Sequence, residues 1–259
     1  MLNRTTLTAC AIAALASMSH AQTISITFEN LLPSGGTALT PVFVGLDDGT
    51  FNLFNPGGNA SAGLELVAEV GQTGTLISEF QLASPSGVAD TGFGPGGPIL
   101  GGQSATVDLN AGDATVNRFL SFASMIVPTN DLFIGTPNAI EVFDAGGNFN
   151  GPITFEILGS QVWDAGTEVN NADDGAAFLQ GIDGGLGTPQ NGSIALFFDD
   201  PNASSYLDSL IGRTTAPGFD IASTFTSSTA IARVTIVPTP GAIALLPIAG
   251  AVSLRRRRA

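Results

Sequence analysis

The sequence predicts an all-β protein, an antiparallel β-sandwich with one or two short helices. Three observations lead to this prediction. Apolar and polar residues alternate in several short stretches, which is typical of strands with one buried face. The 259 residues include 33 glycines and 15 prolines, the residues of tight turns, and no lysine. Seventeen phenylalanines supply apolar volume for one large core.

Four stretches with a period of two are expected to form strands that bury one face. Their inward residues, in chain order, are Ile24, Ile26 and Phe28; Ala105, Val107 and Leu109; Ile153, Phe155 and Ile157; and Ala230, Ala232, Val234 and Ile236. Two continuous apolar runs, 119–127 and 194–198, predict central strands whose second face is covered as well.

Helices and long loops fill the remainder of the chain. Short helices are expected near residues 64–69 and 204–211. The glycine-rich segments 92–102 and 181–192 predict long surface loops. We expect all of these elements to belong to one domain, residues 22–237.

Residues 1–21 have the layout of a secretory signal peptide. Arg4 precedes an apolar run, and small residues precede an expected cleavage site between Ala21 and Gln22. The run is too short to span a bilayer. A buried first helix is the alternative interpretation, but the segment has no amphipathic pattern. We therefore expect an exported protein.

Cleavage at that site would remove Cys10 and His20, the only cysteine and the only histidine. The mature protein would then lack disulfides, a Ser-His-Asp triad, a Cys-His pair and a histidine zinc site. Without lysine it also lacks a Schiff base and a phosphate-binding loop of the Gly-Lys type. The main catalytic option left is a carboxylate pair, as in glycosidases. We expect no enzyme activity, with a carbohydrate-active enzyme as the alternative.

Residues 238–259 predict a C-terminal sorting tail. A turn is followed by the mainly apolar run Gly241–Leu254 and by Arg255–Arg258. In a helix this run would cover about 21 Å, short of the roughly 30 Å hydrocarbon core. The arginines favour a cytoplasmic position for this end. The tail resembles the PEP-CTERM tails of bacteria, which exosortases cut, although Pro-Thr-Pro replaces Pro-Glu-Pro. A short membrane anchor and a basic nucleic-acid tail are the alternatives.

The body of the chain is strongly acidic. Between residues 22 and 237, three arginines and 22 acidic residues give a formal net charge of −19. Such a charge repels nucleic acid and anionic membrane surfaces. It attracts divalent cations, and carboxylate and carbonyl oxygens are the ligands that calcium prefers. Acidity that only maintains solubility is the alternative explanation.

Two segments, Ser121–Gly135 and Gln161–Glu168, each run from strand-like apolar residues into a polar turn that contains one aspartate, Asp131 or Asp164. The pair resembles the N-terminal domain of the spondin family, as in F-spondin and mindin, with its Pro-x-x-Asp and Asp-Ala-Gly-Thr turns. Residues 24–30 are similar to the family's opening strand, and residues 62–71 to its short helical turn. The resemblance covers about residues 23–236 and implies a β-sandwich.

The resemblance also implies a calcium site. In that family, calcium is held by the aspartates of the two turns, here Asp131 and Asp164, and by an acidic residue of an earlier strand. Asp108 is the candidate for the third ligand, with Asp113 as the substitute. Three carboxylates would offset the charge of Ca²⁺, and carbonyls and water would fill the other positions. Glu168 would either add a ligand or remain a solvated neighbour.

Other interpretations of these residues remain open. Asp131 could be a turn aspartate that accepts hydrogen bonds from its own backbone. No EF-hand loop is present, because Gly181 occupies the twelfth position of the best register. Trp163, the only tryptophan, is either a core anchor for the loop or an exposed contact for a partner.

Taken together, these features predict an exported, non-catalytic, calcium-binding adhesion or matrix module at the bacterial cell surface. Its expected partners are a surface polysaccharide or another surface or matrix protein, and an exosortase-like enzyme that processes the tail. Membrane contact is expected only through that tail. A structural envelope protein that assembles with itself is a further alternative.

Overall fold

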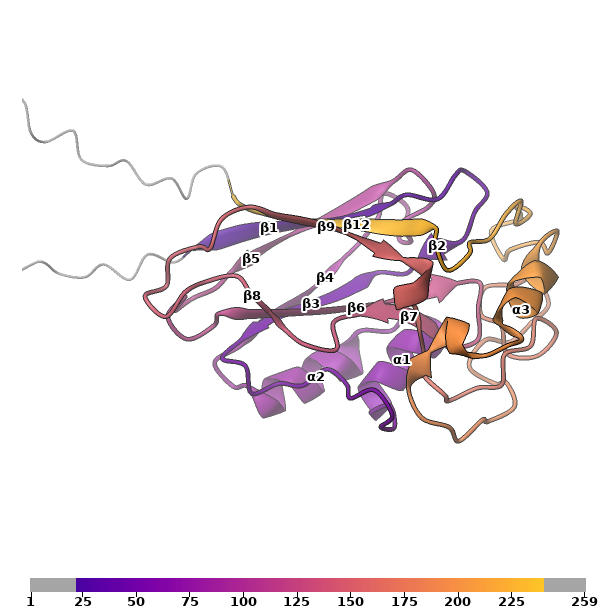
Figure 1. Ribbon diagram of the computed structural model, residues 1–259, viewed down its shortest axis with the longest axis horizontal. Coiled ribbons are helices and arrows are strands. Elements are labelled where there is room, and N and C mark those ends of the chain that lie inside the picture. Colours follow the sequence, from indigo (N-terminus) through magenta and orange to yellow (C-terminus); the bar gives the residue numbers. More distant parts are fainter. Residues whose placement is uncertain (1–21, 240–259) are drawn as a thin grey trace, which may run out of the picture.

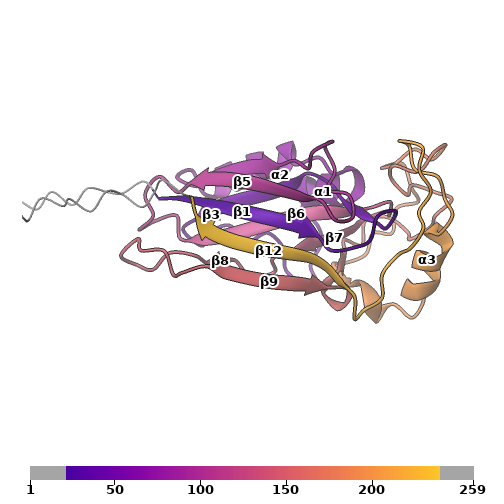
Figure 2. The ribbon, with the colours of Figure 1, turned by 90° about the horizontal axis from the view of Figure 1, so that it is seen from above.

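The four predicted alternating strands form one antiparallel sheet. The computed structural model describes residues 22–239, so the predicted signal peptide and all but the start of the predicted sorting tail lie outside the described residues. The sheet has the order β5-β1-β12-β9 (Figure 2). These strands are β1 (Thr23–Asn30), β5 (Ser104–Asn110), β9 (Ile153–Leu158) and β12 (Ala230–Pro238). In β1 every second side chain is buried, as the sequence pattern predicts.

A second, eight-stranded sheet packs against the first and completes the β-sandwich (Figure 1). Its main path is β11-β10-β7-β6-β3-β4, and β2 and β8 pair with β6 outside this path. The strands are β2 (Ala38–Leu39), β3 (Val42–Asp47), β4 (Val88–Gly92), β6 (Phe119–Val127), β7 (Leu132–Gly135), β8 (Ile140–Glu141), β10 (Trp163–Asp164) and β11 (Ala195–Leu196). All-β architecture is therefore confirmed.

The run 119–127 is the central strand β6, and all its residues after Phe119 are buried. The first sheet covers one face of β6 and two helices cover the other (Figure 1). The prediction of a second central strand at 194–198 was wrong. Only β11 forms there, at the sheet edge, before the 3₁₀ helix Phe197–Asp199. The turn lets the Phe197 ring pack against Tyr206, with centroids 6.2 Å apart.

Two of the three α-helices were expected from the sequence. They are α1 (Ala62–Val70) and α3 (Ala203–Leu210). The Ser61 hydroxyl accepts a hydrogen bond from the Leu64 N–H at the start of α1, and Gly71, with φ 68°, ends it. The sequence analysis missed α2 (Gly74–Ala83), which has no side-chain cap and is stabilised by packing against α1.

Apolar side chains fill two layers. Between the sheets, the rings of Phe28 and Phe122 meet edge to face at 5.2 Å. Beneath α1 and α2, Phe43, Phe51 and Phe80 form a second cluster, with the Phe51 and Phe80 centroids 5.0 Å apart. The helices therefore cover the second apolar face of β6.

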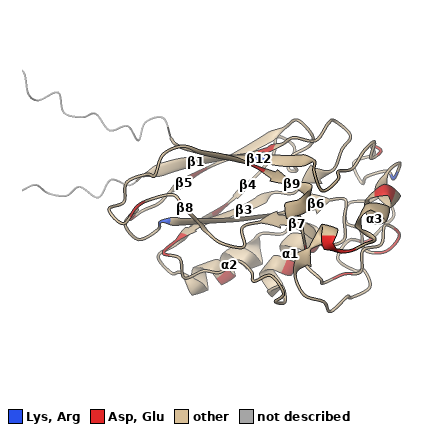
Figure 3. Ribbon diagram, viewed as in Figure 1, with Lys and Arg blue, Asp and Glu red and all other residues tan. Residues whose placement is uncertain are grey.

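Most charged residues lie at the surface, whereas Asp47, Glu69, Asp131, Asp164 and Glu168 are buried (Figure 3). On the outer face of the four-stranded sheet, the Arg233 guanidinium contacts the carboxylates of Glu29 and Glu156, each at 2.8 Å. None of the helices within residues 22–239 has the length and apolar character that a membrane crossing requires.

Candidate metal centre

Strand pairing brings the two aspartate turns together. Residues 128–131 connect β6 to β7, and β10 pairs antiparallel with β7. In this register Asp164 lies opposite Leu132, the residue after Asp131. The Ala165 N–H donates to the Asp131 carbonyl oxygen at 3.2 Å. Two turns that are far apart in the sequence therefore share one end of the large sheet.

The Asp131 carboxylate is fully buried, and its two oxygens have different surroundings. Oδ2 accepts hydrogen bonds from the Thr167 N–H at 2.8 Å, the Thr167 hydroxyl at 3.2 Å and the Glu168 N–H at 3.1 Å. Oδ1 is buried without a hydrogen-bond partner. Asp131 thus binds the neighbouring turn and not its own. A buried oxygen without a partner is costly unless something else satisfies it.

Asp164 is 8 % exposed and organises its own turn. Its Oδ1 accepts the Gly166 N–H at 2.7 Å, an Asx turn, and its Oδ2 accepts the Asn170 side-chain amide at 2.6 Å. The Asn170 Oδ1 atom is itself buried without a partner. A carboxylate oxygen has two lone pairs, so both Asp164 oxygens retain acceptor capacity.

The electrostatics of this pair disfavour two negative charges. Burial, and after it the nearby Asp164 carboxylate, raise the pKa of Asp131 to about 8. Burial also raises the pKa of Asp164, and Asp200 contributes. The ionised form of each carboxyl is therefore destabilised, and a bound proton or cation would relieve this.

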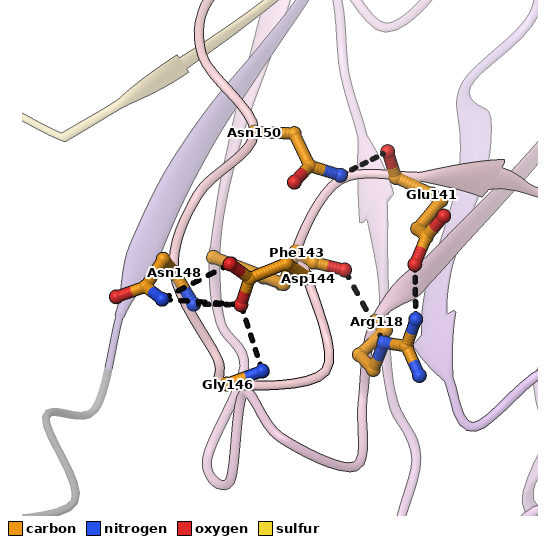
Figure 4. A network of polar contacts seen from close by, with 7 residues as sticks. All are labelled: Arg118, Glu141, Phe143, Asp144, Gly146, Asn148 and Asn150. Atoms are coloured by element: carbon orange, nitrogen blue, oxygen red, sulfur yellow. Dashed lines mark hydrogen bonds and ion pairs between the residues drawn. The ribbon is translucent and has the colours of Figure 1, made fainter.

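The turn of Asp144, which follows β8, shows the contrast (Figure 4). Asp144 lies at the surface, where its Oδ1 accepts the Gly146 N–H at 2.8 Å and the Asn148 N–H at 2.9 Å. The Asn148 side chain also contacts Oδ2, at 3.0 Å. These hydrogen bonds, led by the Asn148 side chain, lower the pKa of Asp144. Its own loop satisfies this carboxylate, whereas Asp131 keeps one oxygen unpaired.

The structure does not bring Asp108 to Asp131 and Asp164. Asp108 lies in β5, between the inward-facing Val107 and Leu109, so its side chain points outward from the four-stranded sheet and contacts Ser25. Ser25 is near the start of β1 and pairs with Asp108 there, whereas Asp131 lies between β6 and β7, toward the other end of the sandwich (Figure 1). The period of two that buries its neighbours thus keeps Asp108 away.

Asp113, the substitute for Asp108, is also separate from the pair. It lies in an exposed turn beyond β5 and accepts hydrogen bonds from the Thr115 N–H and hydroxyl, at 2.9 and 2.6 Å. Those bonds, with the hydroxyl first, lower its pKa. Among residues 22–239, no three His, Cys, Asp or Glu side chains are grouped so that they could hold a metal ion.

Glu168 is not a solvated neighbour of the site, because its side chain is buried and hydrogen-bonded. Its side chain is buried, with Oε1 accepting the Gly187 N–H at 2.7 Å and Oε2 accepting the Asn130 amide at 3.3 Å. A Cβ atom on Gly175 or Gly187 would lie 2.6 Å from Oε2, so the lack of a side chain at both positions permits this close approach. Burial raises the pKa of Glu168. Glu168 therefore links the loop that contains Gly187 to Asn130 in the turn of Asp131.

Sequence analysis missed the role of Asn130. Its Oδ1 accepts the Tyr206 hydroxyl at 2.8 Å, and its own N–H donates to that hydroxyl oxygen at 2.9 Å. Its side-chain amide also donates to the Asp174 carbonyl at 2.7 Å. Asn130 thereby connects the turn of Asp131 to α3. No local pattern signals this role, because the partners are distant in the sequence.

Trp163 is partly buried and packs against the cluster beneath the helices. Its ring meets Phe54 edge to face, with centroids 5.1 Å apart. Of the two interpretations of Trp163, the structure supports the core anchor.

Comparison with curated proteins found no match to this chain. A protein-family model described as Spondin_N matches residues 24–180. The match begins in β1 and includes both aspartate turns, while α3 and β12 lie beyond it. It covers more than half of the 259 residues. The chain therefore belongs to the spondin N-terminal domain family.

Proposed function

We propose that the turns of Asp131 and Asp164 bind one calcium ion, and that the ion cross-links the β6–β7 turn to the turn after β10. The observation that carries this proposal is the Asp131 Oδ1 atom, which is buried, unpaired and adjacent to a second carboxylate. Two carboxylates offset the charge of Ca²⁺, and oxygen donors suit this cation.

Asn170 is the best candidate for a further ligand. Its Oδ1 is a second buried oxygen without a partner, and its amide nitrogen already contacts Asp164. Amide oxygens are common calcium ligands. Asn170 follows Asp164 by six positions, and a sequence search limited to acidic residues passes over it. Asp131, Asp164 and Asn170 would therefore hold the ion, and the ion would neutralise the buried charge.

A catalytic carboxylate pair fits these surroundings poorly. A glycosidase needs two acids that face a sugar. Asp131 is fully buried and Asp164 nearly so, which leaves no access for a sugar residue. Burial suits a structural cation better than a substrate, so we propose a non-catalytic protein.

Membership in the spondin N-terminal domain family indicates an extracellular module of the adhesion or matrix type. The finer assignment is our proposal. It places the module at the bacterial cell surface or in secreted polymer, bound to a surface polysaccharide or to another surface or matrix protein. The arginine tail would contact the membrane until an exosortase-like enzyme removes it.

Terbium luminescence tests the site. Tb³⁺ replaces calcium in oxygen sites, and Trp163, adjacent to Asp164, is the only tryptophan that could sensitise its emission. Sensitised emission is expected from the wild-type chain and should disappear with excess calcium. Asp131→Asn and Asp164→Asn should lose it, whereas Asp108→Asn should retain it. Absence of emission from the wild type, or equal emission from Asp131→Asn, would refute the site.

A second readout separates ligation from orientation at Asn170. Terbium lifetimes in H₂O and D₂O count the water molecules on the ion. If Asn170 is a ligand, Asn170→Ala admits one additional water, and Asn170→Asp keeps the wild-type count. An unchanged count in Asn170→Ala would show that the residue only orients Asp164.

A further inference from the structure

A cavity of about 450 Å³ opens at the same end of the sandwich as the aspartate turns. It is bounded by Ala38 of β2, by Val127 and Pro128 at the end of β6, and by loops that contribute Phe93, Phe178 and Phe219. Its volume is within the range of pockets that bind small molecules. Nothing in the proposed calcium site uses this cavity.

The lining contains no charged side chain, although the described chain is rich in carboxylates. Its hydroxyls are already occupied. The Thr40 hydroxyl accepts the Met125 N–H at 3.1 Å, and the Thr215 hydroxyl donates to the Phe219 carbonyl at 2.8 Å. Gln103 also lines the cavity, and its Oε1 accepts the Leu100 N–H at 3.3 Å. A ligand in this cavity would therefore meet mainly apolar surface, which favours uncharged, apolar molecules.

The position of two exposed phenylalanines also indicates that the cavity is a binding site. Among the large apolar side chains that the described residues expose, the two phenylalanines are Phe93, 63 % exposed, and Phe178, 44 % exposed. Both line this one cavity. Apolar side chains gathered at the mouth of a pocket are typical of a binding site, whereas scattered ones need no explanation.

Backbone strain at Phe178 is an independent observation. Its φ is +64°, a conformation that bulky side chains rarely adopt, and the other non-glycine residue with positive φ in the described chain is an asparagine. Hydrogen bonds hold this segment from both sides: the Ala177 N–H donates to Thr129 at 3.0 Å, and the Phe178 carbonyl accepts from Ala216 at 2.7 Å. Strain that surrounding structure maintains is found at ligand sites.

We propose that this cavity binds a small, uncharged, apolar ligand and that Phe178 is held in a strained conformation to form its wall. The described ends of the chain do not fill the cavity, because Ile24 pairs with Pro238 at the opposite end of the sandwich (Figure 1). The inference is independent of calcium, since Asp131 and Asp164 do not line the cavity.

Titration of the full-length chain with N-phenyl-1-naphthylamine, a neutral apolar dye, tests the proposal. Saturable binding to one site is expected. Phe178→Gly and Phe93→Ser should each weaken it about tenfold or more, since one order of magnitude in Kd corresponds to the loss of one good apolar contact. Leu82→Ser is the matched control, because Leu82 is 83 % exposed and does not line the cavity. It should bind the dye as the wild type does.

Thermal unfolding of Phe178→Gly provides the second measurement. Glycine adopts positive φ without strain, so this variant should melt close to the wild type while losing the dye. Equal dye affinity in wild type and both variants would overturn the proposal. So would a dimer of the wild type that Phe93→Ser dissociates in sedimentation, because the cavity would then be covered by a second copy. If Phe178→Gly unfolds, Phe93→Ser alone decides.

Discussion

The Thr167 N–H donates to the Asp131 carboxylate at 2.8 Å, across 36 positions of the sequence. This bond connects the turn after β6 to the turn after β10 through Oδ2 of the carboxylate. The other oxygen, Oδ1, has no hydrogen-bond partner. The predictions below depend on this division.

Stability without calcium should depend on pH in an unusual direction. The pKa of Asp131 is raised from 3.8 to about 8 in the folded state. The folded protein therefore holds a proton that the unfolded chain releases, so the contribution of Asp131 to stability is fully present below about pH 4 and falls as pH rises toward 8. Burial raises the pKa of Asp164 and Glu168 too, which adds to the same trend. Urea unfolding in chelator at pH 5 and pH 8.5 measures this.

Calcium should reverse that trend, because the ion replaces the proton. With saturating calcium, stability at pH 8.5 should equal or exceed that at pH 5. A loss of stability with pH that is the same in calcium and in chelator would count against the site.

Asp131→Asn should separate charge from hydrogen bonding. The asparagine oxygen can still accept from Thr167 and Glu168, while the buried negative charge is removed. In chelator at pH 9 the variant should be more stable than the wild type, since each unit of pKa shift corresponds to about 1.4 kcal/mol. Calcium should no longer raise its melting temperature.

Asp131→Ala is the informative comparison for that variant. It leaves the Thr167 and Glu168 N–H donors without an acceptor, which costs up to about 1–3 kcal/mol for each donor that is buried. It should therefore melt below the wild type even in chelator. Equal stability of the Asn and Ala variants in chelator would contradict the structural role of Oδ2.

Tyr206→Phe should destabilise the fold without abolishing calcium binding. Removal of the hydroxyl leaves the Asn130 N–H and Oδ1 without this buried partner, at a cost of about 1–3 kcal/mol. Chemical denaturation measures the cost, and calorimetry measures the calcium affinity. A fully neutral substitution would show that Asn130 does not depend on α3.

Two helical glycines provide a matched pair for the packing of α1 against α2. A Cβ on Gly63 would lie 2.6 Å from the Leu76 Cα, whereas a Cβ on Gly74 would meet nothing within 4 Å. Gly63→Ala should cost about 1–3 kcal/mol by overpacking, and Gly74→Ala should be neutral or stabilise by up to about 1 kcal/mol. Equal unfolding midpoints for the two variants would contradict the close approach of the helices.

Sequence patterns predicted those parts of the fold whose burial can be recognised from the alternation of neighbouring residues. The alternation in β1, β5, β9 and β12 is such a local signal. The pattern failed for α2, whose stability depends on packing, and for 194–198, where an apolar run turns at the sheet edge. Length and hydrophobicity alone do not distinguish a central strand from a bent segment.

For the candidate site, the motifs predicted two of the three chosen residues as neighbours. Asp131 and Asp164 lie in turns of recognisable sequence, and strand pairing brings them together. The choice of Asp108 depended on a less certain segment, and the side-chain alternation of β5 directs it outward. Asn130 and Asn170 were missed because their roles depend on contacts that neither spacing nor composition encodes.

Calorimetric titration of the full-length chain with calcium at pH 8 tests the central claim most directly. We predict one calcium per chain for the wild type and for Asp108→Asn, and no measurable binding for Asp131→Asn or Asp164→Asn. Wild-type affinity in Asp131→Asn, or loss of binding in Asp108→Asn alone, would contradict a site formed by the two paired turns.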